Sequence, residues 1–200
     1  PTGLIIGGSL KLRGTGVFAL ASQNQVGNLA ADISGPLNFT NAFGFNISTV
    51  DGVAGINTAG NNLYLIAGTD ATGFQITQNA GANVVTTGAR TVIQASAFDQ
   101  SALASITADR LALIATADGN WTLPGANDAN SFSAFTRGEL LFNDVSTLTI
   151  ETVVTGPNFG SVNGILSSNN AVTLRTGGLL TLAGVAIAQI GPTLRPRRFA

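Results

Sequence analysis

Short segments in which apolar and polar residues alternate recur along the chain at a regular spacing. Alternation with period two places the first and third residues of a segment on one face and the polar residues on the other, which is typical of β-strands. Three pairs of these segments begin eight residues apart, which leaves four residues for a strand and four for a corner. The starting residues are Leu37 and Phe45, Leu140 and Leu148, and Val172 and Leu180. We therefore expect an all-β chain with short strands, joined by corners rich in glycine and asparagine.

One segment, Ser101–Ala117, is rich in alanine and leucine and is the best candidate for a helix. The β-branched residues Ile106 and Thr107 interrupt it, and we interpret Leu111–Ala115 as another strand. A short helix in this segment stays open as the alternative.

A longer match relates the two halves of the chain. The pattern Leu37-x-Phe39 followed by Phe45-x-Ile47 recurs 103 residues later as Leu140-x-Phe142 followed by Leu148-x-Ile150. The next part of the match, Gly55-Ile56 and Leu63-x-Leu65, recurs as Gly164-Ile165 and Val172-x-Leu174, after about half a dozen extra residues around positions 156–160. Repeat architectures tolerate insertions that are confined to turns, so this match predicts a solenoid.

A parallel β-helix accounts for the alternation, the corners and the repeat together. About 20 residues per coil predict roughly ten coils for a chain of this length. We expect residues 1–190 to form one β-helical repeat segment of a larger protein and residues 191–200, with Pro192 and Pro196, to be a tail or linker. An antiparallel sandwich or jelly roll is the alternative, but it does not readily explain the 103-residue match.

Three stretches in the first half carry a family resemblance: Val26–Ala31, Pro36–Asn41 and Phe45–Gly52, the last followed by Gly55-Ile56. In composition and period they resemble the repeats of filamentous-haemagglutinin-type exoproteins, large bacterial surface proteins exported by two-partner secretion. The resemblance in composition and spacing extends over most of the chain. The family's amino-terminal secretion domain is not evident, so the segment resembles the stalk.

The resemblance implies a right-handed parallel β-helix outside the cell or on the bacterial outer surface, with a structural role in adhesion or biofilm formation. It implies an outer-membrane transporter as partner during export, and a glycan or protein on a host or neighbouring cell as partner afterwards. End-to-end self-association, as in an extracellular filament or layer, is an alternative function, because open β-helix ends can stack on other chains. We expect no nucleic-acid partner and no membrane span.

The composition excludes several kinds of chemistry. The chain has no histidine or cysteine, so zinc sites built on these ligands, thiol chemistry and a Ser-His-Asp triad are excluded, and nine basic against ten acidic residues do not favour polyanion binding. We therefore predict no catalytic residue, no metal ligand and no cofactor. A carbohydrate-active β-helix enzyme is a second alternative, and the nearest groupings for it are Asp109 with Arg110 and Asp118 with Asp128.

Two aromatic residues are candidates for contact with a ligand. Tyr64 falls at an outward position, and Trp121 follows a Gly-Asn turn. Exposed rings stack on sugars, although a single outward ring on a solenoid more often covers its neighbours. The run from Arg195 to Arg198 holds three of the nine basic residues and is interpreted as part of the tail.

Overall fold

The computed structural model describes residues 3–68, 73–156, 160–184 and 187–189. Within them the chain is all-β: seventeen strands form one large sheet, and four more form two separate two-stranded sheets. Neighbouring strands of the large sheet run parallel throughout, whereas the two small sheets are antiparallel hairpins. The prediction of an all-β chain is confirmed, and an antiparallel sandwich is wrong for these residues.

The large sheet consists of the following strands: β1 (Ile6–Thr15), β2 (Phe18–Ser34), β3 (Leu37–Asn41), β4 (Phe45–Ile47), β7 (Ile56–Asn57), β8 (Leu63–Ala67), β9 (Gln75–Gln78), β10 (Val84–Ala95), β11 (Ala97–Gln100), β12 (Ile106–Ala115), β13 (Trp121–Thr136), β14 (Leu140–Asp144), β15 (Leu148–Ile150), β18 (Ile165–Ser167), β19 (Val172–Thr176), β20 (Leu180–Leu182) and β21 (Ile187–Gln189). The short hairpin is β5 (Thr49–Val50) with β6 (Val53–Ala54), and the outer hairpin is β16 (Thr152–Gly156) with β17 (Gly160–Asn163). The alternative of a helix within Ser101–Ala117 is wrong, because β12 occupies most of that segment.

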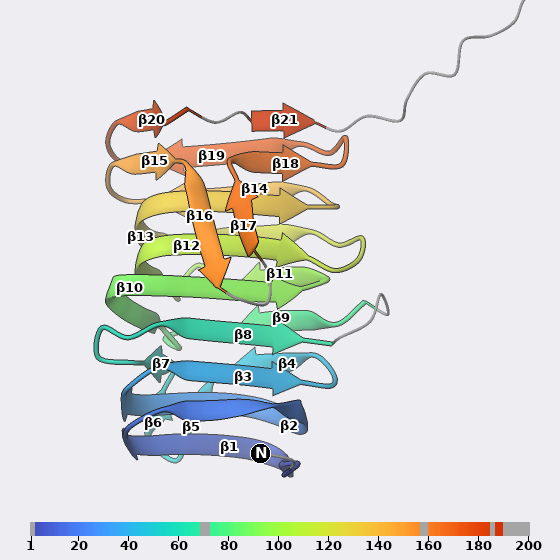
Figure 1. Cartoon of the computed structure of the whole chain (residues 1–200), viewed down its shortest axis with the longest axis vertical. Coiled ribbons are helices and arrows are strands. Elements are labelled where there is room, and N and C mark those ends of the chain that lie inside the picture. Colours follow the sequence, from blue (N-terminus) through green and yellow to red (C-terminus); the bar gives the residue numbers. More distant parts are fainter. Residues whose placement is uncertain (1–2, 69–72, 157–159, 185–186, 190–200) are drawn as a thin grey trace, which may run out of the picture.

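Strands that lie far apart in the sequence stack in three columns (Figure 1). The first column joins Phe18, Leu37, Leu63, Thr91, Leu111, Phe132, Ile150 and Leu182. The second column joins Phe45, Ile76, Phe98, Trp121, Leu140 and Val172. The third column joins Leu12, Ala31, Ile56, Val84 and Ile106.

The first column passes through eight layers of the described chain, fewer than the roughly ten expected. The reason is that the layers differ in length. Paired residues are as few as 17 positions apart, as in Asn24 and Asn41, and as many as 32 apart, as in Ile150 and Leu182. Hairpins and loops at the corners take up the additional residues.

The core fills the space between the columns with the alternate apolar residues that the pattern predicted. Leu37, Phe39, Phe142 and Ile150 are fully buried. Aromatic rings of successive layers contact each other, and the Phe132 and Phe142 rings lie nearly parallel with centroids 4.3 Å apart. Stacking thus gives each short strand two apolar neighbours, which no isolated four-residue strand has.

Buried amide side chains lie where strands end at a corner. Asn24 and Asn41 follow the first-column parts of β2 and β3, and Gln78 and Gln100 end β9 and β11 of the second column. Each amide bonds backbone groups or a neighbouring amide; the Asn41 Oδ1, for example, accepts from the Val26 backbone N–H at 2.9 Å. A buried polar group is tolerated when it is hydrogen-bonded, and these amides satisfy backbone groups that the bend leaves without strand partners.

The 103-residue match between the halves is present in the structure, with one difference in placement. Phe18, Leu37 and Leu63 lie in the first column, whereas their counterparts Trp121, Leu140 and Val172 lie in the second. Conversely, β4 of the second column and β7 of the third correspond to β15 and β18, which both pair with the first-column part of β13. The repeat therefore exchanges the first column with the other two. Its extra residues form the outer hairpin, which occupies the place that the short hairpin has in the first half.

Within the described part of the chain, no helix has the length and apolarity that crossing a bilayer requires. The expected boundary at residue 190 and the tail with Arg195 fall outside the described residues.

Candidate functional site

A polar groove lies at the corner between the third and first columns. Two adjoining hollows of about 290 Å³ and 80 Å³ form it, and both are lined by Gly88 and Asp109. Among the other lining residues, those with polar side chains are Asn62, Thr87, Arg90, Thr107, Arg110, Asp128 and Asn130. Strand pairing brings most of these residues together, because inner segments of β10, β12 and β13 lie side by side at this corner.

The charged side chains of the polar groove are partly paired with one another. Asp109 accepts a hydrogen bond from the Asn130 amide at 3.1 Å, and its second oxygen lies 3.6 Å from the Arg110 Nε. Asp128 accepts from the Ser146 hydroxyl at 2.8 Å. The larger hollow is thus lined by Arg90, Arg110 and Asp109, and the smaller one by Asp109 and Asp128. Together they form a set that both donates and accepts hydrogen bonds.

The outer hairpin packs beside this groove and across the outside of the first column (Figure 1). Arg90, which lines the groove, donates to the Val154 carbonyl of the hairpin and to the Tyr64 hydroxyl. The Arg90 guanidinium also lies over the Tyr64 ring, 5.5 Å from its centroid. Beneath the hairpin, Val153 is buried with Val92 and Ala112, so a second, smaller apolar cluster lies on the outside of the sheet.

The structure places the two predicted ligand-contact residues differently. Tyr64 points outward but is half-buried, and its hydroxyl is bonded to Arg90. Trp121 is fully buried and stacks on Phe98, with ring centroids 6.2 Å apart. Its expected exposure is wrong, because β13 begins at this residue and the alternation turns the ring inward. Tyr64 thus covers its neighbours, and Trp121 belongs to the core.

The acidic groupings singled out in the sequence are brought together only in part. Asp109 and Asp128 line one hollow, whereas Asp118 is not among its lining residues. Among the described residues, no group of three or more histidine, cysteine, aspartate or glutamate side chains could hold a metal ion. Asn127, the neighbour of Asp128 in the sequence, lies inside β13 and is fully buried.

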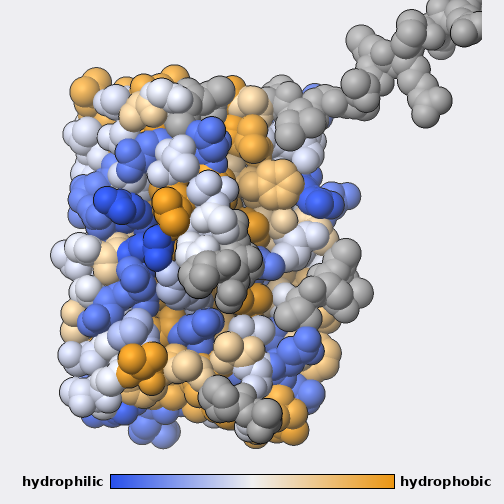
Figure 2. Space-filling view, viewed as in Figure 1, coloured by the Kyte–Doolittle hydropathy of each residue, from blue (hydrophilic) through white to orange (hydrophobic). Residues whose placement is uncertain are grey.

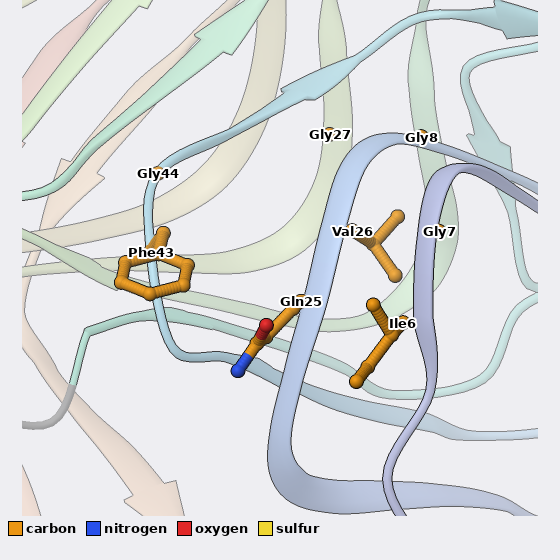
Figure 3. Close-up of a pocket in the computed structure, with 8 residues that line it drawn as sticks. All are labelled: Ile6, Gly7, Gly8, Gln25, Val26, Gly27, Phe43 and Gly44. Carbon is orange, nitrogen blue, oxygen red and sulfur yellow. The ribbon is translucent and has the colours of Figure 1, made fainter.

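A second, shallower hollow lies near the first layers and is mostly apolar (Figure 3). Glycines from three successive layers, Gly8, Gly27 and Gly44, line it together with Phe43 and Ile6. Figure 3 shows Phe43 on one side, Ile6 on the other and Gln25 between them. A Cβ on Gly27 would come within 2.9 Å of the Gly8 carbonyl oxygen, and one on Gly44 within 2.5 Å of the Gln75 carbonyl oxygen. Gly27 and Gly44 therefore serve the close packing of the layers.

The role of Arg90 was not evident in the sequence. Its partners Tyr64 and Val154 are 26 and 64 residues away, so no local spacing connects them. The sequence did carry a signal for the outer hairpin that Arg90 contacts. The extra residues around positions 156–160 indicated an insertion between two strands of the repeat.

Comparison with known proteins found no matching family model, no similar curated protein and no similar solved structure.

Proposed function

We propose that the chain is a segment of a right-handed parallel β-helix that serves as a stalk in a large secreted or surface-attached bacterial exoprotein. In this role it spaces an adhesive or effector region away from the cell surface and contributes to adhesion or biofilm formation. The observation that carries the proposal is the first column, which runs through eight layers of parallel strands over one continuous core.

The hydrogen bonding of the stack supports this role. In a stack of parallel strands, the backbone bonds between layers lie roughly along the stacking axis, because they join each strand to those above and below. A stalk pulled at its two ends is loaded along that axis. Nearest-neighbour contacts then govern its stability, as in other solenoids.

The outward side chains also suit a surface exposed to water. Only 10% of the residues are charged, and outward positions of the second column carry Asn46, Thr77, Asp99 and Thr122. Figure 2 shows polar and apolar groups interspersed over the viewed face. Threonine and asparagine keep such a surface solvated, and threonine favours extended backbone.

A pulling experiment tests the stalk proposal. Because the chain has no cysteine, Ser9→Cys and Thr181→Cys provide two specific attachment points, both exposed and in the first and last layers. We expect extension in successive steps, each releasing one layer of about 17–32 residues. Release of the whole chain in a single step would contradict a layered stalk and favour one cooperative globular domain.

The polar groove favours a second candidate function, saccharide binding. The exposed Arg110 presents donors for a carboxylate, and Asp128 and Asn130 present groups for hydroxyls. We infer that an acidic polysaccharide is the better ligand, because a neutral one offers no carboxylate to the Arg110 guanidinium.

Binding of polygalacturonate, with dextran for comparison, tests this function in a calorimeter. We expect Arg110→Ala to weaken polygalacturonate binding about tenfold or more, the loss of one charge-assisted pair. Arg175→Ala, an exposed arginine of β19 outside the polar groove, is the control. Equal binding of polygalacturonate by wild type and Arg110→Ala would refute saccharide binding in the polar groove. Release of unsaturated or reducing ends, abolished in Asp109→Ala, would instead support an enzyme.

A further inference from the structure

The two hollows of the polar groove differ in the sign of their charge. The larger hollow is lined by two guanidinium groups, Arg90 and Arg110, and by one carboxylate, Asp109. The smaller hollow is lined by the carboxylates of Asp109 and Asp128 and, among the described residues, by no cationic side chain. Because Gly88 and Asp109 line both hollows, a ligand that fills the groove meets a positive part and a negative part in succession.

In the larger hollow, Arg110 is the group that an anion can reach. Its side chain is 55% exposed, and its Nε lies 3.6 Å from the Asp109 Oδ2, which is too long for a good hydrogen bond. Arg90, in contrast, already donates to the Val154 carbonyl and to the Tyr64 hydroxyl. The larger hollow is therefore suited to one carboxylate, bound by the Arg110 guanidinium.

The carboxylates beside the smaller hollow have few donors. The Ser146 hydroxyl lies 2.8 Å from the Asp128 Oδ1 and 3.1 Å from the Asp144 Oδ1, yet it has only one proton to donate. Asp144 is itself buried and adds a second negative charge beside Ser146. Within the described parts of the chain, neither aspartate has an ion-pair partner. The negative charge of the half-buried Asp128 is therefore not neutralised by any described side chain.

The volumes of the two hollows limit what each can hold. The larger hollow, at about 290 Å³, is close to the lower limit of about 300 Å³ for ligand pockets. The smaller hollow, at about 80 Å³, has room for two or three water molecules of about 30 Å³ each. A sugar ring therefore fits only the larger hollow, and the smaller hollow accepts a substituent such as an ammonium group.

The register of β12 and β13 gives the distance between the two charged parts. Asp128 pairs with Thr107, and Arg110 lies three positions further along β12. At about 3.3 Å per residue along a strand and about 4.8 Å between strands, the backbone positions of Arg110 and Asp128 are at most about 11 Å apart. Two linked sugar rings span such a distance. A ligand that meets both groups therefore carries its anionic and its cationic group on neighbouring sugars.

We propose that the polar groove binds an acidic saccharide in which a uronate is linked to an amino sugar with a free amine, in preference to a uronate homopolymer. This inference rests on the saccharide-binding function proposed above. The uronate carboxylate pairs with Arg110, and the ammonium group of the neighbouring sugar enters the smaller hollow beside Asp109 and Asp128. A homopolymer would bring a second carboxylate towards these carboxylates, and like charges in contact disfavour binding.

Two forms of one oligosaccharide test the proposal in a calorimeter. The first has alternating glucuronate and N-acetylglucosamine, and the second is the same oligosaccharide after removal of the acetyl groups. A weakly acidic buffer keeps the amine protonated, and a chelator keeps metal ions out of the smaller hollow. We expect the deacetylated form to bind wild type about tenfold or more tighter, the effect of one added charge-assisted pair.

Three variants locate the two charged groups of the ligand. Asp128→Asn keeps the size of the side chain and an acceptor for Ser146, and it is expected to abolish the preference for the deacetylated form without changing the affinity for the acetylated one. Asp99→Asn removes the same charge at an exposed position of β11, outside the groove, and should keep the preference. Arg110→Ala is expected to weaken the binding of both forms.

The outcomes separate this inference from the saccharide-binding function. Equal affinity of wild type for the two forms, with both weakened by Arg110→Ala, would overturn the inference and leave saccharide binding in place. A preference that persists in Asp128→Asn would also overturn it. If neither form binds and polygalacturonate does not bind either, saccharide binding itself is refuted, and the inference with it.

Discussion

At the scale of single residues, some glycines are required because the layers approach too closely for a side chain. A Cβ added at Gly35 would overlap the carbonyl oxygen of Gly16 in the layer below. A Cβ added at Gly125 would overlap the carbonyl oxygen of Ala104 in the same way. Both contacts involve backbone, which cannot move aside without shifting a layer.

We expect Gly35→Ala to lower the free energy of unfolding by about 1–3 kcal/mol, through overpacking between layers. Gly8→Ala is the control, because a Cβ there meets nothing within 4 Å. Urea unfolding followed by circular dichroism measures both. Equal free energies of unfolding for the two variants would show that the layers at Gly35 can move apart without a loss of stability.

A second residue-scale prediction concerns the buried Asn127. Its Oδ1 accepts from the Ile106 backbone N–H at 2.8 Å and from the Gln100 amide at 2.7 Å. Asn127→Ala leaves the Ile106 N–H unpaired and leaves the Gln100 amide nitrogen with its bond to the Gln78 side chain alone. We expect it to lower the free energy of unfolding by about 2–4 kcal/mol. Asn130→Ala, an exposed position of the same strand, should change it by less than about 0.5 kcal/mol. Thermal unfolding of the pair decides whether the buried amide stabilises the corner.

At the scale of the element, the outer hairpin ties together layers that are distant in the sequence. The hairpin follows β15, yet its contacts through Arg90 and Tyr64 reach β10 and β8. Its counterpart, the short hairpin, makes a smaller contact of this kind through the Lys11–Asp51 ion pair with β1. Both hairpins thus hold earlier layers from the outside.

We expect Arg90→Ala to release the outer hairpin while the stack remains folded. The loss of two hydrogen bonds should lower the free energy of unfolding by about 1–2 kcal/mol. Amides of β16 and β17 should then exchange with deuterium faster, while those of β12 stay protected. Arg110→Ala serves as control, since Arg110 is exposed and contacts Asp109 at the strand surface. Unchanged exchange in the hairpin of Arg90→Ala would contradict this role.

Comparison of particular elements shows why only part of this could be predicted from the sequence. β3, β4, β15 and β20 carry clear alternation, and they lie where the pattern predicted them. β2 and β13 were not anticipated as strands of 17 and 16 residues, because buried amides at Asn24 and Asn127 carry the extended chain around a corner without a turn signal. The polar groove was missed as a unit, since its residues meet only through the pairing of β10, β12 and β13.

At the scale of the whole molecule, stability should vary with distance from the ends of the stack. A layer in the middle has two neighbours and an end layer has one, so nearest-neighbour terms make the ends the weakest part. We expect amides of β1 and β19–β21 to exchange fastest and those of β10, β12 and β13 slowest, when dilute protein is measured by mass spectrometry. Uniform exchange along the chain would contradict this gradient and would show that the molecule unfolds as one cooperative unit.

The exchange of columns in the internal repeat has a consequence for longer arrays. A third copy at the same interval would return to the columns of the first copy, and a fourth to those of the second. Insertions between corresponding strands would then emerge alternately on two different sides of the stack. Appendages on such an array would point in two directions, and neighbouring appendages on one side would be separated by two repeats.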